Sequence, residues 1–222
     1  MLKPYAAKLE NIKSEITQIG IDVVDAMELS LRALEDKKID TLKSIEITEK
    51  KLQQKSNEID NIILTTLALY SPEAKDLRQL VSYLKITNEL VRTGSNAKDF
   101  AKMFKKSYSD DLNTSMILEY TIPLLKSALL SLQTSISILD EVNPQHIEEK
   151  YHRVIVEESK TDDLYLMIEK NILKLISKNL DLSKEYFDIL SSLRRLEKIA
   201  DRSVSIANLL HFAQIGGDIV QS

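Results

Sequence analysis

The chain has 222 residues, of which 43% are hydrophobic, 29% are charged, and none is cysteine or tryptophan. A chain of this length and apolar content can bury the core of one large domain or two small ones. Without cysteine, disulfides, zinc–thiolate sites and cysteine nucleophiles are excluded. Only 4 glycines and 4 prolines are present, and this scarcity of turn formers favours an all-α fold.

Charge and hydropathy restrict the partners that the chain can have. The formal net charge of −4 is uneven, because residues 1–110 carry 18 Lys and Arg against 17 Asp and Glu, whereas residues 111–222 carry 12 against 17. A nucleic-acid-binding surface needs a concentrated basic excess, so this balance argues against nucleic acid and favours a cation in the second half. The N-terminus lacks the apolar segment of a secretion signal, and charged residues interrupt every long apolar stretch. We therefore expect a cytoplasmic protein whose membrane association is at most peripheral.

Apolar residues recur at three- and four-residue spacing through most of the chain, which predicts long amphipathic helices. The first is expected over residues 4–34 and the second over residues 40–70, with Asp40 as its N-cap. Ser71-Pro72-Glu73 combines a capping residue, a proline suited to the first helical position and an acid in the first turn. This signal predicts a third helix that runs to Lys106.

The polar segment 107–114 is the expected linker to a second set of helices. Asn143-Pro144 marks the start of one of them, and Gly216-Gly217 lies beyond the end of the last. The helices expected in this half have the approximate ranges 114–140, 143–179 and 181–215.

Two sets of three helices suggest an internal duplication. A shift of 106 residues places residues 84–101 on residues 190–207. Three identical pairs align: Leu84 with Leu190, Leu90 with Leu196, and Ala101 with Ala207. The sequence therefore predicts an all-α protein of two tandem three-helix bundles, residues 1–110 and residues 111–222.

Two pairs of carboxylates interrupt the apolar stripes of the fifth and sixth predicted helices. Glu158 and Asp162 lie four residues apart, as do Glu197 and Asp201, so each pair shares one helix face. Four inward-facing anions are costly to bury without a positive partner. A bound Mg²⁺, Ca²⁺, Mn²⁺ or iron ion would supply one, because these cations accept oxygen ligands. The alternative is that the acids pair with Arg or Lys from another helix or a partner chain, or lie at a wet edge of the bundle.

Three segments of the chain resemble motifs of the PhoU family. Residues 196–203 (LEKIADRS) are similar to the family's Leu-Glu-Arg-Ile-Gly-Asp-x-Ala motif, and residues 158–165 (ESKTDDLY) are similar to its acid-x-x-aliphatic-acid motif. Residues 71–78 (SPEAKDLR) resemble the Pro-x-Ala-x-Asp-Leu-Arg sequence that opens the third helix of the family's first repeat. Taken together, these segments make the resemblance extend over essentially the whole chain.

The resemblance implies a fold and a function. It implies PhoU-like tandem three-helix bundles and a divalent or trivalent metal ion held by Glu158, Asp162, Glu197 and Asp201. It also implies a regulator of phosphate uptake and of the phosphate-starvation response, without enzyme activity. Such a protein acts by contact with the cytoplasmic face of a phosphate transporter or with a regulatory protein. Self-association as a homodimer is a further expectation.

The first repeat departs from the family pattern. Its third helix reads Val91-Arg92-Thr93-Gly94-Ser95 where the motif has two acids. In its second helix the corresponding pair is Glu49 and Gln53. Of four ligands only Glu49 is left, so we expect that the first bundle has lost its metal and that the second has kept one.

Other motifs offer weaker alternatives. Glu149-x-x-His152 is similar to one half of a ferritin-like di-iron site, but such a site needs two copies and only one is present, so His152 is expected at the surface or at the edge of the bundle. His146 and His211 have no partner at ligand spacing. Neither a nucleophile elbow nor a Walker loop occurs. A ferritin-like oxidase and a plain helical adaptor remain the alternative functions.

Overall fold

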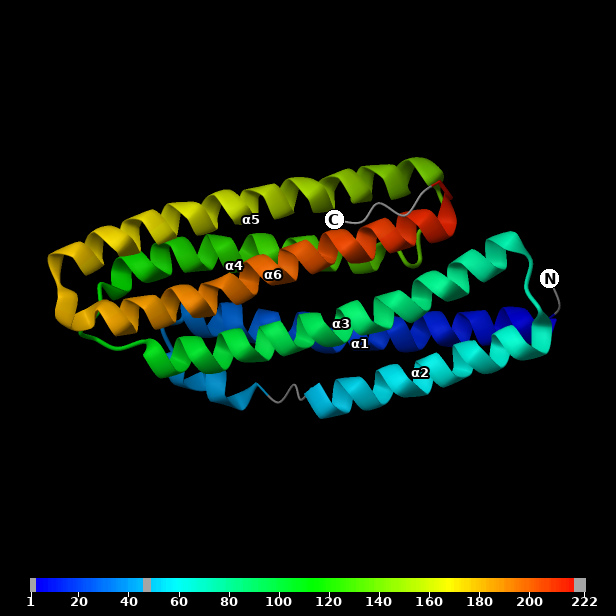
Figure 1. The fold of residues 1–222 in the computed structure, drawn as a ribbon, viewed down its shortest axis with the longest axis horizontal. Helices are drawn as coiled ribbons and strands as arrows, with labels where there is room; N and C mark the ends of the chain where they lie inside the picture. Colours follow the sequence, from blue (N-terminus) through cyan, green and yellow to red (C-terminus); the bar gives the residue numbers. More distant parts are fainter. Residues whose placement is uncertain (1–2, 46–48, 218–222) are drawn as a thin grey trace.

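The fold is entirely helical over the residues that the structure describes. The computed structural model describes residues 3–45 and 49–217, and these contain six long α-helices, two short 3-10 helices and no strand. In chain order the elements are α1 (Lys3–Glu35), η1 (Ile39–Ser44), α2 (Glu49–Tyr70), α3 (Ala74–Ser107), α4 (Thr114–Ser137), α5 (Pro144–Lys178), η2 (Leu180–Leu182) and α6 (Ser183–Gln214) (Figure 1). The expectation of an all-α chain with six long helices is confirmed.

The helices form two bundles that lie side by side. Helices α1, α2 and α3 make up one bundle, and α4, α5 and α6 make up the other (Figure 1). The most extensive helix–helix contact is between α3 and α6, one from each bundle, and α1 also packs against α4. As a result the buried apolar side chains form one continuous core across both bundles. That residues 1–110 and 111–222 are separate units stays a prediction.

The same burial pattern occurs in both halves, as a duplication requires. A shift of 106 residues takes buried positions of α3 onto buried positions of α6: Leu80 onto Tyr186, Tyr83 onto Ile189, Leu90 onto Leu196, and Phe100 onto Ile206. A shift of 109 residues does the same for α2 and α5: Leu52 onto Thr161, Ser56 onto Tyr165, Ile59 onto Ile168, and Ile63 onto Ile172. The tandem repeat inferred from a few identities is therefore visible in which side chains are buried.

Asparagine caps begin both long helices of the second bundle's first hairpin. Asn143 Oδ1 accepts a hydrogen bond from Gln145 N at 3.0 Å, which confirms the start expected at Asn143-Pro144. Asn113 Oδ1 accepts one from Met116 N at 3.1 Å and so caps α4 in the same way. Each cap satisfies an amide that has no partner within the helix.

The predicted second helix begins later than expected. Asp40 does not cap an α-helix but lies within η1, and α2 begins at Glu49; residues 46–48, which the prediction also placed in this helix, lie outside the described residues. The cause lies at the end of α1, where Lys37 adopts a left-handed conformation with φ of 57° and Lys38 N donates to Ala33 O at 2.8 Å. The reversed chain then buries Leu42 against the core in a 3-10 turn.

The predicted cap of the third helix is also wrong in detail. Ser71 has a φ of 43° and its amide donates to Leu67 O at 3.2 Å, so it ends α2 and does not cap α3. Helix α3 begins at Ala74, and Glu73 is the N-cap residue without a side-chain cap bond. A helix end and a helix start compete for the same three residues here, and closure of α2 takes Ser71.

One described helix, α4, is long and apolar enough to cross a membrane by length and composition. Its most apolar window has a mean hydropathy of 1.2 and is 56% buried inside the protein. Much of the apolar surface of α4 is thus used in contacts with α5, α6 and α1, as in the core helix of a packed bundle.

Gly20 allows α1 and α4 to approach closely. A Cβ atom at this position would lie 2.8 Å from Ile136 Cδ1 and 3.2 Å from Ile136 Cγ2. We expect Gly20→Val to lower the free energy of unfolding by about 1–3 kcal/mol, the usual cost of overpacking a core. Urea denaturation of the full chain would measure it. In an Ile136→Ala background the same substitution should cost much less, and an equal loss in both backgrounds would contradict the contact.

Candidate metal centre

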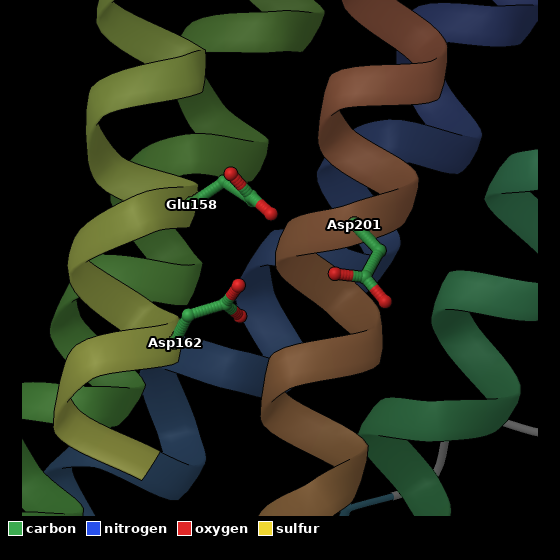
Figure 2. Close-up of side chains that lie close together, drawn as sticks. All are labelled: Glu158, Asp162 and Asp201. Atoms are coloured by element: carbon green, nitrogen blue, oxygen red, sulfur yellow. The ribbon is translucent and has the colours of Figure 1, made fainter. Parts of the chain in front are cut away.

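Helices α5 and α6 are antiparallel neighbours, and they bring three carboxylates together. Glu158 and Asp162 extend from α5 towards Asp201 on α6 (Figure 2). One oxygen of each residue can be chosen so that all three lie within 4.8 Å of one another. Among the described residues this is the one group of acidic or histidine side chains that meets this spacing. The i, i+4 spacing of the α5 pair is what aims both side chains at the same point on α6.

The α5–α6 hairpin has a constant register, and several contacts reveal it. Each contact pairs two residues whose numbers add to 359: His211 Nε2 lies 2.6 Å from Glu148 Oε1, Tyr151 donates to Asn208, and Arg194 lies over the Tyr165 ring. Glu158 and Asp201 obey the same rule. The site is therefore part of a regular interface whose neighbouring turns are held by aromatic and charged contacts.

Asp162 carries the clearest sign of a missing positive partner. Its Oδ1 atom is buried and accepts no hydrogen bond from any residue in the described ranges. A buried carboxylate oxygen without a partner is costly, because it has lost its water and gained nothing in return. An oxygen-binding cation fits this position, since it would coordinate the atom that the protein leaves unsatisfied.

The electrostatics of the cluster point the same way. Burial raises the pKa of Glu158, and the neighbouring Asp162 and Asp201 carboxylates raise it further. Burial also raises the pKa of Asp201, with Asp162 adding to the effect and Arg194 and Arg202 opposing it. Both shifts mean that the surroundings disfavour the ionised form of these two carboxyl groups. A divalent cation would reverse this effect at neutral pH by neutralising the mutually repelling charges.

Glu197 is arranged differently from the other three predicted ligands. It lies one turn before Asp201, but its Oε2 atom is 2.7 Å from Arg194 Nε, and it is not in the closely spaced group. Burial raises the pKa of Glu197, while Arg194 lowers it and Asp201 and Asp162 raise it. The arginine therefore supplies part of the compensation that the sequence assigned to a metal, and ligation by Glu197 stays a prediction.

The cluster opens to solvent through a pocket of about 630 Å³. Glu158 and Asp201 form its acidic side, and Lys198 and Arg202 form its basic side. Arg202 is already engaged, because its Nη1 atom lies 2.8 Å from Glu89 Oε2 on α3. A hydrated cation can thus reach the carboxylates from the surface.

The corresponding positions of the first bundle look different. The burial match between α2 and α5 places Glu49 and Gln53 where α5 has Glu158 and Asp162, and both are exposed. Val91 is buried in the core and Ser95 is half-buried. These side chains offer one carboxylate, which is consistent with the expected loss of the first site; that loss stays a prediction.

The histidines lie elsewhere. His211 was assigned no partner from the sequence, yet it pairs with Glu148 across the hairpin. The constant register of the α5–α6 interface predicts this pair, but the register is known only once the residues that face each other are known. Glu149 and His152 are both exposed, and Glu149 accepts a hydrogen bond from Gln145. His152 therefore lies at the surface, as expected.

Thermal melting with and without Mn²⁺ would test the site. At a metal concentration about 100 times the dissociation constant, binding should stabilise the parent chain by about 2.7 kcal/mol. The metal-dependent rise should vanish in Asp162→Asn/Asp201→Asn and persist in Glu49→Gln, the matched change in the first bundle. A rise that survives the double substitution would place the metal elsewhere. An unchanged rise in Glu197→Gln would remove Glu197 from the ligands.

Comparison with known proteins identifies the family of the chain. The family model for the PhoU domain matches the chain twice, at residues 16–104 and 124–210. The phosphate-specific transport system accessory protein PhoU homolog of Clostridium acetobutylicum is 23% identical over 205 residues, which cover 92% of this chain and 91% of that protein. The phosphate-specific transport system accessory protein PhoU of Escherichia coli is 22% identical over 221 residues, which cover 96% of this chain and 89% of that protein.

Two solved structures share the fold. The crystal structure of PhoU from Pseudomonas aeruginosa superposes with a TM-score of 0.82 at 19% identity, covering 96% of this chain and all of that one. The phosphate transport system regulatory protein PhoU from Streptococcus pneumoniae gives a TM-score of 0.79 at 19% identity, covering 98% and 100%. With the domain matched in both halves, this chain belongs to the PhoU family and carries its domain twice.

Proposed function

We propose that this protein regulates phosphate transport through contact with a phosphate transporter or its signalling partners at the cytoplasmic face of the membrane. Relatives that align over nearly their whole length are named as accessory proteins of phosphate-specific transport. The role is carried over as a whole because the matches cover 91% and 89% of these two relatives and the chain shares the PhoU fold. In this proposal the protein acts by binding and catalyses no reaction.

We further propose that a metal ion is part of this regulator. The observation that carries this step is the unsatisfied Asp162 Oδ1 beside Glu158 and Asp201. These three carboxylates would hold a hard or borderline cation such as Mg²⁺, Ca²⁺, Mn²⁺ or iron through oxygen ligands. The ion would supply positive charge that joins α5 to α6, so its presence would change the rigidity of the second bundle's outer hairpin.

A ferritin-like oxidase gains no support from the side chains. Such sites place Glu and Glu-x-x-His ligands in the interior of a bundle. Here Glu149 and His152 face solvent, and the closely spaced acids carry no histidine. The regulatory proposal needs neither oxygen chemistry nor an enclosed substrate pocket.

A gene deletion would test the regulatory role in the cell. Loss of the gene should release phosphate uptake and a phosphate-starvation reporter from repression at high phosphate, and the parent gene should restore repression. Asp162→Asn/Asp201→Asn should restore it poorly, whereas Glu49→Gln should restore it fully. If the deletion leaves both uptake and reporter unchanged across phosphate levels, the proposed role is wrong. If the double variant complements fully, the metal has no part in it.

A further inference from the structure

A second opening lies in the first bundle, away from the acidic cluster. It is a cleft of about 510 Å³ between η1 and the C-terminal half of α3. Leu42, Ile45 and Ala101 line its floor, where Ile45 is partly exposed and the other two are buried. Five lysines surround the floor: Lys43, Lys98, Lys102, Lys105 and Lys106. The volume of this cleft lies in the range of small-molecule sites.

The lysines of this cleft are unusual in having almost no counter-charge. Lys98, Lys102 and Lys106 follow one another at four-residue spacing on α3, so like charges are neighbours on one helix face, an arrangement that destabilises a helix. Lys105 lies 3.4 Å from Asp40. The other four form no ion pair within the ranges that the structure describes. In a chain of net charge −4, this concentration of unpaired positive charge needs a reason.

The repeat explains why the cleft is open. In the second bundle, the N-terminal turns of α5 cover the end of α6 through the Tyr151–Asn208 and Glu148–His211 contacts. The equivalent positions of the first bundle, 109 residues earlier, fall in η1, and α2 begins only at Glu49. A full helical cover is therefore replaced by a short 3-10 turn, and the cleft with the α3 lysines lies beside this turn.

We propose that this lysine cleft binds a nucleoside triphosphate, with its phosphates on the lysines and its base against Ile45. Four unpaired ammonium groups match the three to four negative charges of a triphosphate better than those of a single phosphate. The partly exposed Ile45 gives a flat heterocycle an apolar contact that an inorganic polyanion could not use. Lysine suits phosphate as a point charge, without the fixed bidentate geometry of arginine. This site is independent of the metal centre and goes beyond the proposed regulatory role.

Isothermal titration of the full chain, in buffer without divalent cations, would test the proposal. ATP should bind at least about tenfold more tightly than tripolyphosphate, a difference of about 1.4 kcal/mol, and adenosine alone should show no heat. Equal affinity for ATP and tripolyphosphate would overturn the proposal, because it would mean charge attraction only. Tighter binding of dioctanoyl phosphatidylglycerol than of ATP would also overturn it and assign the cleft to lipid headgroups.

Variants make the test specific to the cleft. Lys102→Glu should weaken ATP binding at least about tenfold. It should not lower the melting temperature, because it turns two like-charge pairs on α3, with Lys98 and with Lys106, into opposite-charge pairs. Lys170→Glu, the same charge change on an exposed α5 position, should leave binding unchanged. Ile45→Ser should bring the affinity for ATP close to that for tripolyphosphate. Equal losses in Lys102→Glu and Lys170→Glu would contradict a defined site.

Discussion

The packing of α3 against α6 is the contact on which the rest of the molecule depends. The two helices run antiparallel through the centre (Figure 1) and connect the bundles into one core. Burial of large side chains such as Phe100 and Phe104 supplies the driving force, and the Glu89–Arg202 ion pair joins the helices at their border. Because α3 and α6 pack against each other through one face, another face of α3 packs against α2 and another face of α6 packs against α5.

The acidic cluster is a consequence of how α5 meets α6. A single antiparallel register places Tyr165 under Arg194, Glu158 opposite Asp201, and Glu148 against His211. The contacts on either side fix this register, which brings the three carboxylates close together. Burial and, after it, the neighbouring carboxylates raise the pKa of Glu158 and of Asp201. In the proposed metal site, a cation would offset the charge of these carboxylates and would stiffen this hairpin.

The two repeats have kept one interior and acquired two different surfaces. Buried positions coincide after a simple shift, because both halves must fill the same space around the same helix order. Exposed positions are free of that demand, and Glu49 and Gln53 occupy the positions where α5 has Glu158 and Asp162. The first bundle instead has lysines on α3 that line the cleft next to η1. One duplicated scaffold thus offers an acidic face in one half and a basic one in the other.

The sequence by itself determined the helices, the repeat and the identity of the acidic residues. The helices could be predicted because their signals are local: apolar residues at three- and four-residue spacing and an Asn-Pro start each act within a few helical turns. Where two local signals overlapped, as at Ser71 and at Asp40, the sequence could not say which would prevail, because the ends of α1 and α2 depend on how the chain reverses against the core. Only the tertiary structure decided that Asp162 Oδ1 is left without a hydrogen-bond partner in the described part of the chain, and that Glu148 meets His211. These outcomes require the register between two helices, and that register is set by packing of side chains far apart in the sequence.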